Sequence, residues 1–188
     1  MTPTEHVLKE WKRLQSIDPK VNPFVKTMPF DIVLAQALES TKRYANGKSL
    51  GPFDGITITV KDTLSCATKG LVTNTGSKIY SLEPSIDHTP NESVLAVETL
   101  VKQGAIILCQ TTVPELCWKG TTSSLLYGTT RYPGNLITTS GGSSGGAGAL
   151  ACLDIGSVQC ATDGAGSIRI PASCNSVMGL KPTLGLYV

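Results

Sequence analysis

Aromatic side chains and charge are scarce in this 188-residue chain. Aromatic residues make up 5% of it and charged residues 16%, against a usual charged share of ~25%, and the formal net charge is +2. Positive and negative residues are nearly equal in number, so the chain lacks the excess positive charge that binds nucleic acid or an anionic membrane. The low aromatic content argues against a surface that stacks bases. The hydrophobic share of 40% argues against disorder and predicts one domain with a sizeable core.

Long apolar runs and metal-binding spacings are also missing. No stretch of about 18 apolar residues appears, which predicts no transmembrane span, and the polar N-terminus does not resemble a secretory signal. None of the six cysteines forms a C-x-x-C pair, and with only His6 and His88 no zinc spacing can be built. We therefore expect six free thiols in a reducing, cytoplasmic compartment, with no metal and no cofactor.

The first fifty residues predict two packing helices. Thr4 is expected to cap the first, whose apolar face carries Val7, Trp11 and Leu14, and Asp31 to cap the second, which ends near Gly47. The second helix should bury a stripe made of Val33, Leu34, Ala37 and Leu38. Between the helices, Pro19 and Pro23 predict a loop near Asn22.

After these helices the pattern alternates between helix and strand, which predicts an α/β fold. Apolar, partly β-branched runs predict three strands in one sheet: Ile56–Val60, Ala105–Cys109 and Val158–Ala161. A helix over Glu92–Lys102, with Val94, Leu95, Glu98 and Val101 at helical spacing, is expected to cover one face of that sheet. Gly128–Gly148 reads as a loop, followed by a short helix over Ala147–Leu153.

Two glycine-serine loops are the strongest functional candidates. The first is GGSSGG at 141–146 and the second is DGAGSIR at 163–169. Glycine allows backbone to approach a ligand closely, and adjacent N–H groups in such a loop can bind an oxyanion. The alternative is a flexible linker, but each loop lies between apolar, structured segments rather than between domains.

Most hydrolytic motifs can be excluded by what does not follow these loops. GSSGG matches the G-x-S-x-G elbow, but no histidine follows His88, so that triad cannot be completed. His6 and His88 are expected on the surface. No P-loop lysine follows Gly146, and no lysine has a serine three residues before it. Lys61, at the end of an apolar strand, remains as a general base if it is buried and neutral, or as a solvated lysine beside Asp62.

At this point the residues resemble the amidase signature family of serine hydrolases. The match is carried by GPFDGITITVKD, GGSSGG, ATDGAGSIRIPAS and GLKPT, in that order, and covers Leu50 to the C-terminus. The resemblance implies a mixed β-sheet flanked by helices. It also implies one partial amidase domain, with N-terminal helices over 1–49 and the signature core over 50–188.

The family's Ser-cisSer-Lys triad carries over by position. The resemblance implies Ser167 as nucleophile, Ser143 as the bridging serine on a cis peptide bond, and Lys61 as base. It further implies an oxyanion hole from the backbone N–H groups of Gly164, Ala165, Gly166 and Ser167. Ser144, Asp163 and Arg169 are expected as support, with Asp163 and Arg169 as a pair.

The chain departs from the family pattern in two ways. Family members continue for more than this length again, so it looks truncated, with the C-terminal half absent. Loss of that half is expected to hydrate Lys61, leave it protonated and weaken activity. Smaller departures are Asp54, Thr112, Ser140, Ala161 and Ala165, of which Ala165 is the most consequential because a methyl group there conflicts with a positive φ.

Three functions follow as alternatives. The first is hydrolysis of a small amide through an acyl-enzyme, and the second is the role of the glutaminase-like subunit in a tRNA-dependent amidotransferase. The third is a truncated fragment without activity. The expected partners are a small-molecule amide and either a second copy of the chain or a protein that supplies the missing half. No direct nucleic-acid or membrane partner is expected.

Overall fold

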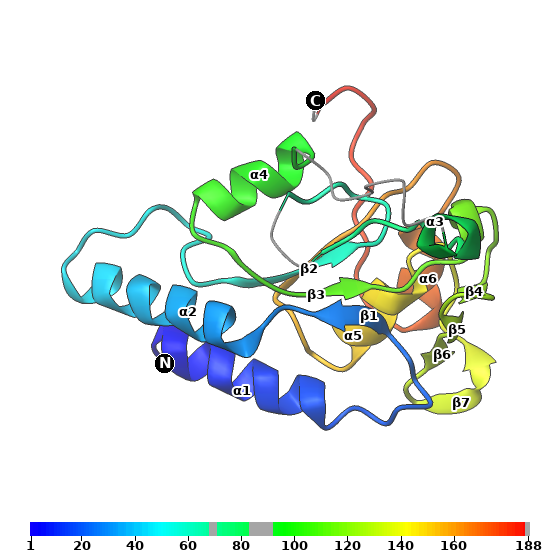
Figure 1. Ribbon diagram of the computed structural model, residues 1–188, viewed down its shortest axis with the longest axis horizontal. Helices are drawn as coiled ribbons and strands as arrows, with labels where there is room; N and C mark the ends of the chain where they lie inside the picture. Colours follow the sequence, from blue (N-terminus) through cyan, green and yellow to red (C-terminus); the bar gives the residue numbers. More distant parts are fainter. Residues whose placement is uncertain (68–70, 83–91, 187–188) are drawn as a thin grey trace.

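A four-stranded sheet forms the centre of the protein, in a computed structural model that describes residues 1–67, 71–82 and 92–186 (Figure 1). The strand order is β1 (Phe24–Thr27), β3 (Ile106–Thr111), β2 (Thr57–Lys61) and β8 (Val158–Cys160). β2 is parallel to both β3 and β8, while β1 is antiparallel to β3. The three predicted strands therefore share one mixed sheet, as expected, and β1 is an addition that the sequence analysis missed.

The register of this sheet puts Lys61 at its carboxyl end. Lys61 is the last residue of β2 rather than the residue after it, and it lies opposite Thr111 of β3. Every residue of β2 and of β3 is buried, as is typical of parallel strands that are covered on both faces. Side chains alternate between the faces of a strand, so consecutive residues at this end serve two different surroundings.

The first two helices pack side by side along the bottom of the view in Figure 1. α1 (Pro3–Gln15) buries Val7, Trp11 and Leu14 as predicted, but its N-cap is Thr2, because the Thr2 hydroxyl accepts from Glu5 N and Glu5 reaches back to Thr2 N. Thr4 instead donates to the Ala37 carbonyl on the second helix. The predicted Thr4 cap was therefore wrong by two residues.

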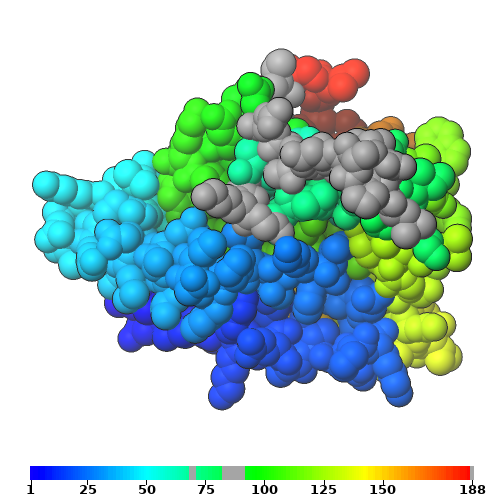
Figure 2. All heavy atoms as spheres, viewed as in Figure 1, coloured from blue at the N-terminus to red at the C-terminus, as the bar shows by residue number. Residues whose placement is uncertain are grey.

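The second helix, α2 (Phe30–Ala45), has Pro29 as its N-cap residue and no side-chain cap, so the predicted Asp31 cap was also wrong. Proline needs no N–H partner and its fixed φ suits the residue before a helix. The helix buries Val33, Ala37 and Ser40, whereas Leu38 of the predicted stripe is exposed. In Figure 2, blue and cyan atoms of the chain up to and just beyond α2 form the lower and left parts of the face shown.

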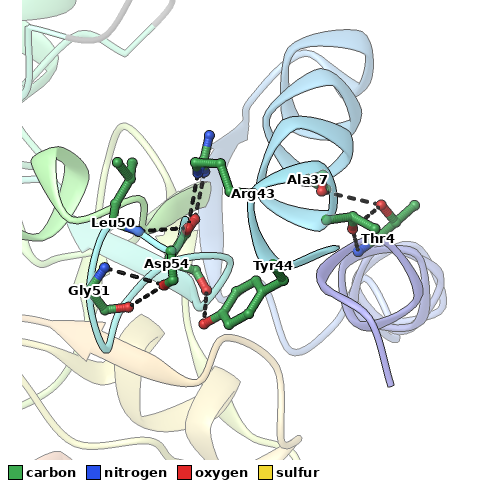
Figure 3. Close-up of polar contacts among 9 residues, drawn as sticks. Thr4, Ala37, Arg43, Tyr44, Leu50, Gly51 and Asp54 are labelled. Atoms are coloured by element: carbon green, nitrogen blue, oxygen red, sulfur yellow. Dashed lines mark hydrogen bonds and ion pairs between the residues drawn. The ribbon is translucent and has the colours of Figure 1, made fainter. Parts of the chain in front are cut away.

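An ion pair fastens α2 to the segment that leads into β2 (Figure 3). Arg43 donates to both carboxylate oxygens of Asp54, at 2.9 and 2.5 Å, and Leu50 N donates to the same carboxylate at 3.1 Å. The Tyr44 hydroxyl donates to the Asp54 carbonyl at 3.1 Å. The Arg43 guanidinium holds the pKa of the buried Asp54 carboxyl down at about 2. This clamp fixes where β2 enters the sheet.

The remaining elements differ from the predictions mainly at their ends. The helix predicted over Glu92–Lys102 is α4 (Leu95–Lys102). It buries Val97 in the core shared with the strands, but Leu95 and Val101 of the predicted apolar face are exposed. The predicted helix Ala147–Leu153 is α5 (Gly145–Cys152). The segment predicted as one loop, Gly128–Gly148, contains the hairpin of β6 (Arg131–Tyr132) and β7 (Asn135–Thr139). It also contains β5 (Gly128–Thr129), which pairs with β4 (Ser123–Ser124) just before the segment. The other elements are α3 (Lys78–Leu82), η1 (Glu115–Cys117) and α6 (Arg169–Cys174).

The core joins the N-terminal helices to the sheet in one cluster. Val7 and Leu14 of α1 belong to the same buried group as Ile58 and Leu108 of the strands. None of the six cysteines is in a disulfide bond, as predicted. Within the described residues, no helix is both long and apolar enough to cross a membrane.

Candidate active site

Lys61 extends from the end of β2 into a cluster of hydroxyl groups, in which its own side chain is fully buried. Its side chain is 0% exposed, and its Nζ lies 2.7 Å from Ser143 Oγ. The same Nζ donates to Thr162 Oγ1 at 2.9 Å and lies 3.4 Å from the Thr162 carbonyl. The solvated lysine considered from the sequence is therefore excluded, and so is the expectation that this chain leaves Lys61 hydrated.

Burial is also what sets the protonation of this amine. Desolvation lowers the pKa of Lys61, while Cys117 and the Asp163 carboxylate raise it and offset part of the effect. The contacts around Nζ are to two hydroxyls, a carbonyl and the Cys117 side chain, without a salt bridge to Lys61 among the described residues. A lysine in such surroundings gives up its proton more readily than one in water, which is the property that a general base needs.

Ser143 is held by an unusual turn before α5. The Gly142–Ser143 peptide bond is cis, as the resemblance implied. A Cβ on Gly142 would lie 2.8 Å from the Lys119 carbonyl and from Thr121 N, so only glycine fits there. Ser144 serves as the N-cap residue of α5, and its N–H donates to the Ser167 carbonyl at 3.1 Å. This bond ties the first glycine-serine loop directly to the second.

The second loop is organised by Asp163. Its carboxylate accepts from Gly166 N at 2.7 Å and from Ile168 N at 3.1 Å, and Arg169 Nε and Nη2 each donate to it at 3.0 Å. Arg169 holds the pKa of the Asp163 carboxyl far below its usual range, so it stays ionised at neutral pH. The predicted Asp163–Arg169 pair is thus present, and it shapes the loop that carries Ser167.

The bond from Gly166 N changes the expected oxyanion hole. Because that N–H points at Asp163, it is not available to a ligand in this conformation. The amides of Gly164, Ala165 and Ser167 make no hydrogen bond to any described residue. Three of the four amides implied by the resemblance therefore remain as donors.

Ala165 does not strain this loop. The positive φ in the loop belongs to Gly166, at 119°, and Ala165 is not among the residues with positive φ. Its side chain is exposed. The expected conflict between the Ala165 methyl group and the backbone was therefore wrong.

Ser143 and Ser167 open onto the same cavity. This cavity has a volume of about 540 Å³, and its other walls come from the Gly164–Ala165 backbone and from an apolar segment that includes Leu116 and Trp118. Both serines line this cavity, but among the described residues no hydrogen bond joins the Ser143 side chain to the Ser167 side chain. The expected chain of contacts is present from Lys61 to Ser143 and open from Ser143 to Ser167.

Two residues near Lys61 were missed from the sequence. Thr162 gives Lys61 its second hydroxyl contact, and it immediately precedes Asp163, so its place in the loop was a usable signal. Cys117 lines the cavity and interacts with Lys61, but nothing in the sequence pattern pointed to it. His6 lies away from this cavity, half-buried, with Nε2 at 3.2 Å from Thr57 Oγ1 and from Ser157 Oγ. His88 lies outside the described residues.

Three of the residues that depart from the family pattern, Thr112, Ser140 and Asp54, have hydrogen-bond partners in the structure. The Thr112 hydroxyl lies 2.6 Å from Thr130 Oγ1 and donates to the Pro23 carbonyl at 3.2 Å. The buried Ser140 donates to the Thr130 carbonyl at 3.3 Å. Asp54 is the anion of the Arg43 clamp. These side chains are therefore accommodated by the fold rather than left without partners.

Comparison with known proteins identifies the family. The profile of the amidase family matches residues 5–187, so the chain belongs to the amidase family. It is 35% identical over 181 residues to a glutamyl-tRNA(Gln) amidotransferase subunit of Sulfurisphaera tokodaii, a match that covers 96% of this chain and 36% of that protein. It is 34% identical to an acylamidase of Rhodococcus erythropolis, over 99% of this chain and 37% of that protein. The chain thus spans little more than a third of these relatives.

Solved structures agree with this assignment. The native peptide amidase of Stenotrophomonas maltophilia superposes with a TM-score of 0.86 at 26% identity, over 99% of this chain and 38% of that one. A bacterial aryl acylamidase of the amidase signature family superposes with a TM-score of 0.79 at 31% identity, over 92% of this chain and 34% of that one. The observed sheet and helices therefore form the amidase-type α/β arrangement that the sequence motifs predicted.

Proposed function

We propose that this chain carries the acyl-transfer site of an amidase, with Lys61 as base, Ser143 as proton relay and Ser167 as nucleophile. The observation that carries the proposal is the 2.7 Å contact between Lys61 Nζ and Ser143 Oγ in a place where Lys61 is completely buried. A buried amine of lowered pKa bound to a serine hydroxyl is an arrangement suited to moving a proton. The shared cavity supports Ser167 as the residue that meets the substrate.

The proposed reaction proceeds through a covalent intermediate. Neutral Lys61 takes the Ser143 proton, and Ser143 takes the Ser167 proton as Ser167 Oγ bonds to the amide carbonyl carbon. The developing oxyanion is bound by the amides of Gly164, Ala165 and Ser167, where one donor is worth about 3–4 kcal/mol. The carbon–nitrogen bond then breaks, and the amine leaves with a proton returned through Ser143. Water attacks the acyl-enzyme and releases the acid.

Labelling with a fluorophosphonate probe tests this site. We expect covalent modification at Ser167, found by peptide mapping, and its loss in Ser167→Ala. Replacement of Lys61 by Met is expected to slow labelling by about 100-fold or more, since general base catalysis contributes typically 10²–10⁴-fold. The labelling rate should rise with pH to a midpoint below the usual lysine value of ~10.4, because burial lowers the pKa of Lys61.

Ser173→Ala is the matched control, because Ser173 is an exposed serine on α6 only a few residues from Ser167. It should label like the unmodified chain. Labelling that persists in Ser167→Ala would contradict the nucleophile assignment. A folded chain that is never labelled would favour the remaining alternative, a fragment without activity of its own.

A second candidate is the glutaminase-like role within a tRNA-dependent amidotransferase. It is favoured by the 35% identity to the amidotransferase subunit from Sulfurisphaera tokodaii. The acylamidase of Rhodococcus erythropolis, at 34%, supports simple amide hydrolysis about equally. Both roles use the same acyl-transfer site and differ in the amide that enters it and in the fate of the released amine.

Substrate competition separates these two roles. Protection of Ser167 from the probe by glutamine, with ammonia as product, would support the glutaminase-like role. Protection by an aryl acylamide, with an arylamine as product, would support the acylamidase role. Because the chain spans about 36% of the length of the amidotransferase subunit, the comparison should also include the chain together with a protein that supplies the remaining part, or with a second copy of itself.

A further inference from the structure

Asp62, the residue after the proposed base, is buried and hydrogen-bonds to three separate segments: the turn Asn74–Gly76, Tyr127 and the end of β3. Its side chain is 0% exposed and accepts from Asn74 N at 3.0 Å, from Gly76 N at 3.0 Å and from the Tyr127 hydroxyl at 2.8 Å. Its backbone is also engaged, because Asp62 N donates to the Thr111 carbonyl and the Asp62 carbonyl accepts from Thr75 N. The proposed reaction uses none of these contacts.

The turn Asn74–Gly76, which Asp62 holds, contacts the segment Pro114–Trp118, in which Leu116–Trp118 form one wall of the cavity. The Thr75 carbonyl accepts from Leu116 N at 2.8 Å, and Ser77 Oγ donates to Glu115 Oε1 at 3.1 Å. Gly76, with φ of 68°, lies so close to the start of this segment that a Cβ would be 2.7 Å from the Pro114 carbonyl. The turn and the wall are therefore in direct backbone contact.

The wall needs such support because its backbone is strained. Leu116 and Cys117 have φ values of 50° and 57°, a region that non-glycine residues rarely adopt. Leu116 is 57% exposed and Trp118 90% exposed, so their own side chains are not anchored in the core. Besides the local bonds from Cys117 N to the Pro114 carbonyl and from Trp118 N to the Glu115 carbonyl, the bond from Leu116 N to the Thr75 carbonyl ties the wall to another part of the chain.

We propose that Asp62 is a positioning residue that couples the strand end carrying Lys61 to the wall Leu116–Trp118 through the turn Asn74–Gly76. Lys61 and Asp62 are consecutive, so one strand end places the base on one side and the wall support on the other. That the wall bounds a substrate cavity rests on the proposed function, whereas the hydrogen-bond chain does not.

The charge of Asp62 matches its donors. An ionised carboxylate only accepts, and here each oxygen faces at least one N–H group, so a neutral amide in its place would set its NH₂ group against a donor. Burial raises the pKa of Asp62 to about 6, with the bonds from Asn74, Tyr127 and Gly76 acting in the opposite direction. At neutral pH the carboxylate is therefore ionised and accepts all three bonds.

Reactivity of Cys117 reports the position of the wall without any need for catalysis. Cys117 is half-buried within the wall, and its alkylation by N-ethylmaleimide can be followed by peptide mapping at fixed pH. In Asp62→Asn we expect Cys117 to react at least threefold faster, while the half-buried Cys152 on α5 is unchanged. The buried Cys109 of β3 should stay protected, which excludes global unfolding.

Asp54→Asn is the matched control for this substitution. Asp54 is also a buried carboxylate with several donors, but it lies before β2 rather than after it. It should leave Cys117 reactivity unchanged even if it lowers stability more. If Asp62→Asn does not fold, Tyr127→Phe takes its place, because it removes one of the three hydrogen bonds to Asp62. Alkylation of Cys117 should then be about twofold faster, and Tyr44→Phe is the control. Unchanged Cys117 reactivity in Asp62→Asn, or in Tyr127→Phe where only that variant folds, would overturn the proposal.

A pH titration adds a signature that a purely structural role would not give. With 5-fluorotryptophan at both tryptophans, the ¹⁹F resonance of Trp118, assigned with Trp118→Phe, should titrate with a midpoint near 6 and that of Trp11 should not. Three other titratable groups lie nearby: Tyr127 contacts the carboxylate, Glu115 contacts the turn, and Lys61 extends to Ser143. The variant Asp62→Asn therefore shows whether the titration belongs to Asp62 or to one of them. Persistence of the titration in Asp62→Asn would contradict the proposal.

Labelling of Ser167 then connects the wall to the proposed reaction. We expect at least a tenfold slower fluorophosphonate reaction in Asp62→Asn and a rate close to the original in Asp54→Asn. If the original chain is never labelled, the proposed function fails while the Cys117 and Trp118 measurements still decide the role of Asp62. If it is labelled and Asp62→Asn labels equally fast, the positioning role is wrong although the proposed function stands.

Discussion

Two neighbouring residues of the nucleophile loop differ in what their backbone permits. Ala165 is exposed and has no positive φ, so its methyl group meets no constraint from the backbone. Gly166 has φ of 119°, and a Cβ on it would lie 2.9 Å from the Ile170 side chain. The position that requires glycine in this loop is therefore 166 and not 165.

We predict that Ala165→Gly leaves the site intact. Labelling of Ser167 should stay within about twofold, as a surface change of ~0.5 kcal/mol implies, and glycine should lower the free energy of unfolding by up to ~1 kcal/mol. Gly166→Ala, as the contrasting variant, should slow labelling strongly, because strain of ~1–3 kcal/mol falls on the loop that carries Ser167. Equal labelling rates for the two variants would contradict this explanation.

At the scale of elements, the clamp between α2 and the start of β2 depends on one ion pair. The Asp54 side chain is 0% exposed and Arg43 27% exposed, so Asp54 is paired in a desolvated place. Since its folded pKa of about 2 lies below its usual value, the pair stabilises the fold at neutral pH. That contribution is lost as the pH falls from about 4 through 2.

Replacement of Arg43 by Leu is expected to lower the free energy of unfolding by about 3 kcal/mol at pH 7, because it leaves a buried carboxylate unpaired. The difference from the original chain should shrink as the pH falls through 4 and 3, because the unpaired Asp54 of the variant takes up its proton at a higher pH than the paired Asp54, whose pKa is about 2. Urea denaturation at pH 7, 4 and 3 measures it. As the control, Lys42→Leu breaks an exposed ion pair with Glu39 and should lower the free energy of unfolding by less than ~1 kcal/mol. An equal loss in both variants would contradict a larger contribution from the Arg43–Asp54 pair.

At the scale of the whole molecule, one hydrophobic core connects the N-terminal helices with the sheet that carries the site. Leu108, in the middle of β3, is 0% exposed and belongs to the same cluster as Val7 and Leu14 of α1. The division into helices over 1–49 and a signature core over 50–188 remains a prediction. The shared core implies that loosening either part affects the other.

We predict that Leu108→Ala lowers the free energy of unfolding by about 2–5 kcal/mol through the cavity that it leaves. For a domain of typical stability, ~5–15 kcal/mol, this is a large fraction, and helical circular dichroism should be lost in the same transition as the sheet. Leu125→Ala, at a side chain that is 86% exposed, is the control and should change little. Separate transitions for helices and sheet would contradict a single core.

The sequence by itself determined the central strands, the order of the two glycine-serine loops and the family. Runs such as Thr57–Lys61 and Ile106–Thr111 are strands in any context that buries them, so local pattern was sufficient there. The predictions misplaced the N-caps of the first two helices, which are Thr2 and Pro29, because several neighbouring residues could serve as caps. Packing in the folded chain selects among them.

Only the tertiary structure decided the environment of Lys61. Its partners Ser143 and Thr162 lie 82 and 101 residues further along the chain, so no local pattern could show whether the amine was solvated or buried. The same holds for β1, whose four residues form a strand because β3 offers them an edge. Burial and pairing depend on which distant segments meet, and that is a property of the folded chain.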